Sequence, residues 1–293
     1  MIRLSNGFEF EYVTASGALA YDGNGWPWEW PLRWLGFIDP SLFLNVMKTV
    51  TLPPRKGNLR WFKPWDCVQL VRGGTVNAIG LTNPGHNWWA EKIGPKVDSS
   101  KIPLVGSIFG EPAAVAIMSM IMNDFDLVAL ELNASCPNTD DDTLSNSKKV
   151  IKSCENVRTT SRHPIWLKLS VAHDAETIVR ATQDMVEAFD INSVPWNIAF
   201  PNKKSPLEKY GGGGVSGKIA QRFTWPFAEK LQSMTDVPVI APSVWDFKDI
   251  STLRAKGFKA FSFGSVFLRY PWRPTLYAKK DQKTKTNTKG ETQ

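Results

Sequence analysis

The sequence predicts an α/β fold, a (β/α)8 barrel of the TIM type, and two patterns carry that prediction. Short apolar runs rich in β-branched residues recur along the chain, and stretches with helical periodicity lie between the later ones. Roughly eight such units fit a chain of 293 residues. An open doubly wound sheet would usually show an early GxGxxG turn instead. A parallel barrel is therefore the expected architecture.

Eight apolar runs are the expected strands, and their order along the chain implies parallel pairing. They are YVTASGAL (12–19), NVMKTVTL (45–52), LVGSIF (104–109), LVALELN (127–133), IWLKLS (165–170), FDINSV (189–194), VPVIAPS (237–243) and KAFSFGS (259–265).

Four stretches are expected to be helices because their apolar residues follow helical spacing. The first carries proline near its start, where a missing N–H costs nothing. The second has acidic residues in its first turn, as the helix dipole favours. The last ends on a glycine suited to a C-cap. They are EPAAVAIMSMIMNDF (111–125), DAETIVRATQDMVEAF (174–189), IAQRFTWPFAEKLQSM (219–234) and FKDISTLRAKG (247–257).

Residues 1–277 are expected to form one barrel domain, with residues 52–100 as an inserted excursion that does not fit the alternation. Residues 278–293 read as a basic, disordered tail. The tail holds five lysines against Asp281 and Glu291, which contributes +3 of the net charge of +7. The remaining charge forms no stripe interleaved with aromatic residues, so no nucleic-acid role is expected.

The cysteine and histidine pattern disfavours disulfides and metals. Cys67, Cys136 and Cys154 show no CxxC spacing, and the three histidines show no ligand spacing. No apolar run reaches the roughly 20 residues of a membrane span, and no signal peptide opens the chain. A cytoplasmic protein without membrane attachment is the expectation.

Polar or small residues mark the ends of several expected strands, which in a barrel meet on one face. Strand ends are often polar for no functional reason, but two lysines here lie within apolar strands, where a charge is rarely placed without a partner. A binding site on this face is therefore the better interpretation. The residues are Lys48, Asn133, Lys168, Asn192, Ser243 and Gly264.

The segment ELNASCPN (131–138) resembles the NLSCPN-type segment of class 1 dihydroorotate dehydrogenases, flavin enzymes of pyrimidine synthesis that have a (β/α)8 barrel. Further segments resemble that family in its order, and together they span residues 4 to 268. These are ASG (15–17), KTVTLPPRKGN, NAIGLTNPG, IWLKLS, INSV and GGGGVSG. The segment NAIGLTNPG resembles the 1B branch of the family most closely.

The resemblance implies oxidation of L-dihydroorotate to orotate, with a hydride passed to FMN and Cys136 as the general base. The alternative that Cys136 is a small buried core residue stays open. Paired amides suit the planar, anionic orotate. The implied substrate residues are Lys48, Asn77, Ile79, Gly80, Leu81, Asn133, Asn138, Asn192 and Ser193.

The resemblance also implies an FMN site at the C-terminal ends of the strands, where Lys168 would stabilise negative charge on the reduced ring. The implied cofactor residues are Ala15, Ser16, Gly17, Lys48, Thr49, Asn133, Lys168, Ile191, Gly213, Gly214, Ser216, Gly217, Ser243, Val244, Gly264 and Ser265.

The turn after the seventh strand departs from the family. VIAPSVWDF (239–247) is two residues shorter than the GxGGI-type turn and has no glycine. Backbone amides of Ser243 and Val244, with a helix N-terminus, are expected to bind the phosphate instead. Two alternatives therefore stay open: a flavin-depleted, non-catalytic binding or assembly protein, or a related flavoenzyme that acts on another dihydropyrimidine.

The electron acceptor has two candidates. The 1B branch uses NAD through an iron–sulfur/FAD subunit, which would be a separate polypeptide because this chain has no cluster cysteines. The 1A alternative is a homodimer that reduces fumarate. The Trp-rich segment at residues 26–34 suits either a partner surface or a packed cover over the barrel. GGGVSGKI (212–219) resembles a P-loop, but Ile219 replaces the Mg²⁺-binding hydroxyl.

Overall fold

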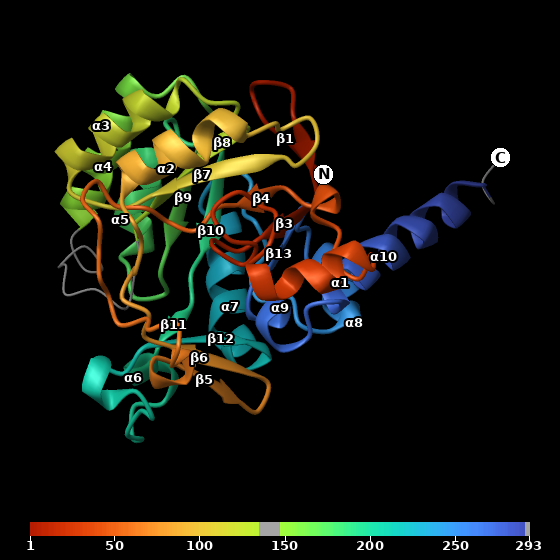
Figure 1. Ribbon diagram of the computed structural model, residues 1–293. Coiled ribbons are helices and arrows are strands. Elements are labelled where there is room, and N and C mark those ends of the chain that lie inside the picture. The colour runs from red at the N-terminus through yellow and green to blue at the C-terminus, as the bar shows by residue number, and fades with distance from the viewer. Residues whose placement is uncertain (135–146, 291–293) are drawn as a thin grey trace.

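The computed structural model describes residues 1–134 and 147–290 (Figure 1). Its centre is a curled parallel sheet of five strands in the order β10-β9-β8-β7-β4. The strands are β4 (Asn45–Val46), β7 (Leu104–Ile108), β8 (Ala129–Asn133), β9 (Ile165–Leu169) and β10 (Ala188–Ile191). The predicted parallel pairing of these five segments is confirmed.

Parallel pairing continues beyond both edges of this sheet. β3 (Tyr12–Thr14) pairs in parallel with β13 (Phe261–Phe263). Single parallel bridges join Val13 to Leu44, Phe189 to Val239, and Ala241 to Phe261. The expected strand at 237–243 is thus present only as isolated bridges.

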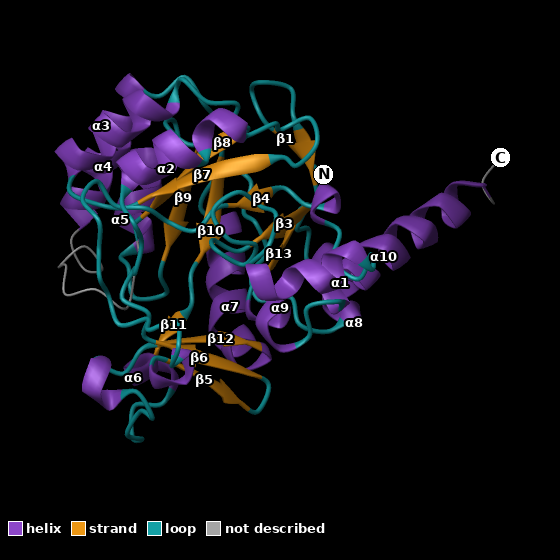
Figure 2. Ribbon diagram, in the orientation of Figure 1, coloured by secondary structure: helices purple, strands orange, loops and turns teal. Residues whose placement is uncertain are grey.

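Helices cover the outer face of the sheet (Figure 2). Their buried side chains form a large apolar layer against the strands. On this face lie α3 (Pro112–Met122), α4 (Ser147–Thr160) and α5 (Ala175–Thr182). Further helices, α7 (Gln221–Gln232) and α8 (Phe247–Ala255), follow later in the chain. α5 ends earlier than expected, since the end of its periodic stretch enters β10. α4 was missed because its apolar face is narrow, with Val150, Cys154 and Val157 at helical spacing.

The amino-terminal hairpin closes one end of the sheet's interior. β1 (Ile2–Arg3) pairs with β2 (Glu9–Phe10). Ile2, Leu4 and Phe10 pack into a buried cluster with residues of the strands, and the rings of Phe10 and Trp166 are 5.2 Å apart. The interior at this end is therefore filled with apolar side chains, which leaves the carboxyl ends of the strands for polar groups.

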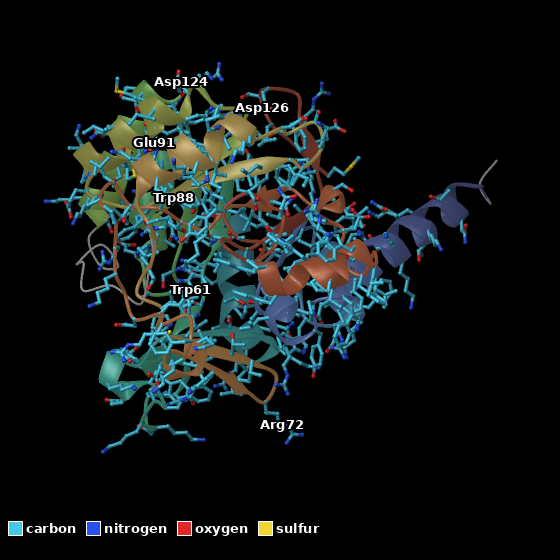
Figure 3. The ribbon with its side chains drawn as sticks, viewed as in Figure 1. Trp61, Arg72, Trp88, Glu91, Asp124 and Asp126 are labelled. Atoms are coloured by element: carbon cyan, nitrogen blue, oxygen red, sulfur yellow. The ribbon has the colours of Figure 1, made fainter. Side chains whose placement is uncertain are left out.

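A second, antiparallel sheet lies beyond the carboxyl ends of β9 and β10 (Figure 1). Its order is β11-β12-β6-β5, from β5 (Val68–Val71), β6 (Gly74–Asn77), β11 (Val194–Pro195) and β12 (Gly214–Gly217). The excursion at 52–100 supplies the β5–β6 hairpin, whose Arg72 points away from the body (Figure 3), and also α2 (His86–Lys92). α6 (Trp196–Ala199) follows β11.

The Trp-rich segment divides between the two roles considered for it. Trp26 is partly buried, and its indole N–H donates to the carbonyl of Gly17 at 3.0 Å. Trp28, Trp30 and Trp34, of which the last two bound α1 (Trp30–Trp34), are exposed. The first tryptophan is therefore a cover, and the others form an aromatic surface.

The expectation of a disordered tail from residue 278 is wrong for the described residues. After α9 (Ser265–Arg269), α10 runs over Arg273–Gly290, and its last turns project from the body (Figure 1). Asp281 is buried and accepts hydrogen bonds from Tyr12 (2.6 Å) and Arg254 (2.6 Å). The composition of the tail does not reveal this anchor, because nearly all residues after Ala278 are polar. No described helix is long and apolar enough to cross a membrane.

Candidate functional site

Polar side chains face the sheet's interior at the carboxyl ends of β7 to β10. The register places Ser107 opposite Glu131, Asn133 opposite Lys168, and Lys168 opposite Asp190. Because successive strand residues alternate, Glu131 and Asn133 lie on one face of β8. This polar layer follows the apolar end of the interior along the same strands.

Lys168 bridges two buried carboxylates. Its ammonium lies 2.9 Å from Glu131 Oε2 and 3.1 Å from Asp190 Oδ2, and the three side chains are 4%, 0% and 1% exposed. Burial alone would lower the pKa of Lys168, but the two carboxylates reverse this and raise it. Burial, with Asp190 nearby, raises the pKa of Glu131. The ammonium is thus held charged and fixed in place.

A chain of hydroxyl groups extends this ion cluster across the site. Ser107 donates to Glu131 Oε1 at 2.7 Å and lies 2.8 Å from the Thr49 hydroxyl. Thr49 is also 2.7 Å from the Ser16 hydroxyl and accepts from the Asn133 amide at 3.0 Å. One buried network therefore joins four of the residues expected at the cofactor: Ser16, Thr49, Asn133 and Lys168.

Sequence reasoning missed Glu131, Asp190 and Ser107. The first two carried a signal, because each is an acid inside a buried strand, as Lys168 is a base inside one. Buried charges of opposite sign on neighbouring strands are expected to pair. The hydroxyl of Ser107 gave no such signal, since a neutral hydroxyl does not require a charged partner.

The Ala15–Gly17 segment lies against two other expected residues. Gly17 has φ +76°, and a side chain there would come within 3.1 Å of Lys48 Cδ. A side chain at Gly264 would meet the Ala15 methyl group at 3.1 Å. The backbone of Ala15 donates to Phe263 at 2.8 Å. The structure thus brings Ala15, Gly17, Lys48 and Gly264 together.

Glu29 supports the cover over this segment. Its carboxylate accepts the backbone N–H of Trp26 at 2.8 Å, and Trp26 in turn bonds Gly17. Burial raises the pKa of Glu29 to about 7, although the Trp26 hydrogen bond works against the rise. The cover therefore contains a carboxyl group that titrates near neutral pH.

The expected amide residues lie on two sheets. Asn192 follows β10, and its side-chain oxygen accepts from the backbone of Ser193 at 2.8 Å. Two residues later the chain enters β11 of the second sheet. There Asn77 pairs with Gly214, and a side chain at Gly213 would collide with the Asn77 carbonyl at 2.6 Å. Ile191 ends β10 beside Asn192.

The segment Ile79–Leu81 has a fixed left-handed turn, with φ of +68° at Gly80 and +55° at Leu81. The Ile79 carbonyl accepts from the backbone of Asn58 at 2.9 Å. The Leu81 carbonyl accepts from the Asn83 side chain at 2.7 Å. Hydrogen bonds from Asn58 and Asn83 therefore hold this segment in its turn.

In the turn at residues 242–246, backbone N–H groups form hydrogen bonds with other residues of the protein. Ser243 has φ +63°. The N–H of Val244 donates to the Ser262 carbonyl at 3.2 Å. The N–H groups of Trp245 and Asp246 donate to one oxygen of Asp249, at 2.9 and 2.8 Å.

Two further turns are expected at the cofactor, one at Gly264–Ser265 and one at residues 213–217. The hydroxyl of Ser265, at the start of α9, is buried and has no hydrogen-bond partner among the described residues. Ser216 bonds Thr75 within the second sheet at 2.9 Å. A side chain at Gly217 would meet the Trp245 ring at 2.7 Å.

Cys136 and Asn138 lie outside the described residues. The interpretation of Cys67 and Cys154 as core residues is confirmed, since both are buried free thiols. Burial raises the pKa of Cys154 to about 12, so neither its position nor its acidity suits a reactive thiol.

Comparisons with known proteins agree with this arrangement. A family model described as dihydroorotate dehydrogenase matches residues 35–243. The chain is 26% identical over 270 residues to the catalytic subunit of dihydroorotate dehydrogenase B (NAD(+)) from Bacteroides thetaiotaomicron, covering 87% of this chain and 82% of the relative. It is 28% identical over 233 residues to a putative dihydroorotate dehydrogenase A (fumarate) from Aeropyrum pernix, covering 76% and 74%.

A solved structure is also similar. The fold matches that of ligand-free DHODH from Eimeria tenella with a TM-score of 0.63 and 13% identity, covering 91% of this chain and 81% of that one. At this identity the likeness concerns the fold alone.

Proposed function

Because the chain belongs to the dihydroorotate dehydrogenase family, whose members are oxidoreductases that act on CH–CH groups in pyrimidine biosynthesis, we propose that it oxidises L-dihydroorotate to orotate with a bound flavin. It is similar to the class 1B members. The observation that carries the proposal is the buried polar network at the carboxyl ends of β7 to β10, which lies within the matched residues.

The substrate would be held by amides and a cation, while a thiol acts on it. Cys136 would remove the carbon-bound proton as general base, and the thiolate it requires becomes more populated as pH rises toward the thiol's ordinary pKa of about 8.5. Asn77, Asn133, Asn138 and Asn192 would orient the planar ring through their amides, with Ser193 and the backbone of Ile79–Leu81 beside them. Lys48 would place a cation near the substrate's carboxylate.

The residues around Gly17 and Lys168 fit the ring of a flavin. Gly17 and Gly264 carry no side chain where a Cβ would crowd Lys48 or Ala15, and the charged Lys168 is preorganised by Glu131 and Asp190. When bound, the flavin accepts the hydride that the substrate gives up. We propose FMN as this cofactor, with Ser265 as one partner of its phosphate, and we assign the remaining expected cofactor residues to its lining.

We also propose that the parallel bridges complete a (β/α)8 barrel within a single domain over residues 1–277. The bridges from Val13 to Leu44 and from Phe189 through Ala241 to Phe261 support an eight-membered ring. In such a ring the cofactor would lie at the carboxyl ends of the strands.

The electron acceptor we propose is NAD, reached through a separate iron–sulfur/FAD subunit, and the oligomer we propose is a homodimer of this chain. Support comes from relatives named as catalytic subunits of an NAD(+) enzyme. The exposed aromatic residues beside Trp26 offer that subunit a surface next to Gly17.

An anaerobic absorbance spectrum before and after addition of L-dihydroorotate tests the function. A flavin band that bleaches is the expected result. A band that ignores dihydroorotate would keep the flavoprotein and reject the substrate. A protein that stays colourless after addition of FMN would reject the enzyme in favour of a non-catalytic binding protein.

A further inference from the structure

The turn 242–246, where a cofactor phosphate is expected, has three consecutive backbone amides that are already in use. Val244 donates to the carbonyl of Ser262, while Trp245 and Asp246 donate to the carboxylate of Asp249. Phosphate sites in such turns need backbone N–H groups that point at the ligand. These three N–H groups point instead at the protein's own oxygens.

Asp249 is the third residue of α8 and forms a capping box with Asp246, so its carboxylate lies at the helix N-terminus, where an anion is favoured. It is 3% exposed, and a single oxygen accepts from Trp245, Asp246 and the side chain of Gln221, the last at 2.8 Å. Gln221 also donates to the Ser243 carbonyl at 2.9 Å, which ties α7 to the turn. Three donors therefore converge on this one oxygen and satisfy it within the protein.

Trp245 fills the space beside this turn. Its side chain is buried, and its ring lies against Gly217 and 5.9 Å from the ring of Tyr270. An expected cofactor-facing glycine is thus covered by an indole. Close approach of a phosphate from that side would require the indole to move.

The charges around the turn do not compensate for the occupied amides. Asp246 is paired with Lys218 at 2.6 Å and lies 3.8 Å from Arg273. These two cations are therefore already matched to one carboxylate, and Asp249 adds a second negative charge at the amides. With Asp249 counted, two carboxylates balance these two cations, so the turn offers a phosphate dianion no net positive charge.

We propose that Asp249 is an internal substitute for the cofactor phosphate at this turn, so that the chain binds riboflavin and FMN with similar affinity. The proposal rests on the proposed function, since it assumes that the flavin ring binds near Gly17 and Lys168. Ser265 remains as a donor on the other side, so a small preference for FMN is compatible with it.

Flavin fluorescence quenching with the full chain, titrated in parallel with FMN and with riboflavin, tests this. A built phosphate site with several charge-assisted hydrogen bonds would favour FMN by more than about 100-fold. We expect the two dissociation constants to agree within about tenfold, which is the contribution of one such bond at the low end of its range. An FMN preference above about 100-fold would overturn the proposal and leave the proposed function standing. Binding of neither flavin would overturn both.

Two variants locate the effect at Asp249. Asp249→Asn keeps an acceptor oxygen but removes the charge, and Asp249→Ala also frees the amides. Both are expected to raise the FMN preference by about tenfold or more, with riboflavin affinity serving as the internal check on folding. Asp174→Asn, at the N-cap of α5, is the matched control and is expected to leave the preference unchanged. An unchanged preference in both Asp249 variants would contradict the proposal.

Discussion

The two ends of the candidate site are built in opposite ways. At the ring end, Lys168, Glu131, Asp190 and Thr49 form a buried polar network whose register is fixed by parallel strands. At the other end, where the cofactor phosphate is expected, the backbone N–H groups of the turn 242–246 donate to Asp249 and Ser262. Strand pairing fixes the first arrangement, whereas the turn bonds to other residues of its own chain.

The comparison shows that the two ends of the candidate site depend on different parts of the fold. The polar network depends on side chains at alternate positions of four strands, so a change in one loop leaves it intact. A phosphate site depends on a single turn, so one carboxylate is enough to occupy its amides. The following four predictions probe the ring end, where the proposed chemistry is concentrated.

The largest effect is expected for Cys136→Ala. Loss of a general base lowers turnover by about 10²–10⁴. Anaerobic stopped-flow measurement of flavin reduction by dihydroorotate checks this. Cys154→Ala, which removes a buried thiol of α4, is the control and should keep the reduction rate. Full turnover in Cys136→Ala would show that another group takes the proton.

Lys168→Met should lower the free energy of unfolding by about 3–5 kcal/mol, because it leaves two buried carboxylates without their cation. Urea denaturation measures this, and Lys168→Met combined with Glu131→Gln should recover part of the loss. Lys256→Met breaks a surface pair with Glu229 and is the control, with an expected loss below about 1 kcal/mol. Equal losses in Lys168→Met and Lys256→Met would refute the buried ion cluster.

Stability should fall as pH rises through the range set by Glu29. Its pKa is raised from 4.5 to about 7 in the folded chain, so the folded state holds a proton that the unfolded state has lost between these values. The contribution, about 3 kcal/mol, is complete below pH 4.5 and gone above about pH 7. Denaturation series at several pH values should show this slope in the wild type and a flatter one in Glu29→Gln. The same slope in both would exclude Glu29 as its source.

The smallest effect is expected for Thr49→Val, which removes the hydroxyl that joins Ser16, Ser107 and Asn133. Leaving buried partners unsatisfied costs about 1–3 kcal/mol. Thermal unfolding at fixed pH measures it. Thr252→Val, on the exposed face of α8, is the control and should change little. A neutral Thr49→Val would mean that the network is not continuous.

Periodicity and strand-end polarity predicted much of this molecule. The five central strands and their parallel order follow from apolar runs, which bury themselves wherever the rest of the chain lies. Lys168 and Asn133 were predicted as site residues because polar groups inside or at the end of such runs need partners. The helical tail and α4 were missed because both segments are mostly polar. A few buried residues, such as Asp281 and Val150, hold these helices against the rest of the protein.

The sequence by itself determined the five central strands and the polar residues that end them, because alternation and apolar runs are local properties. Only the tertiary structure decided the partners of those residues: Glu131 and Asp190 for Lys168, and Asp249 for the amides of the turn. These contacts join separate strands, or a turn to a side chain whose direction the fold sets. Their energy comes from burial and hydrogen-bond geometry, which exist only once the chain has folded.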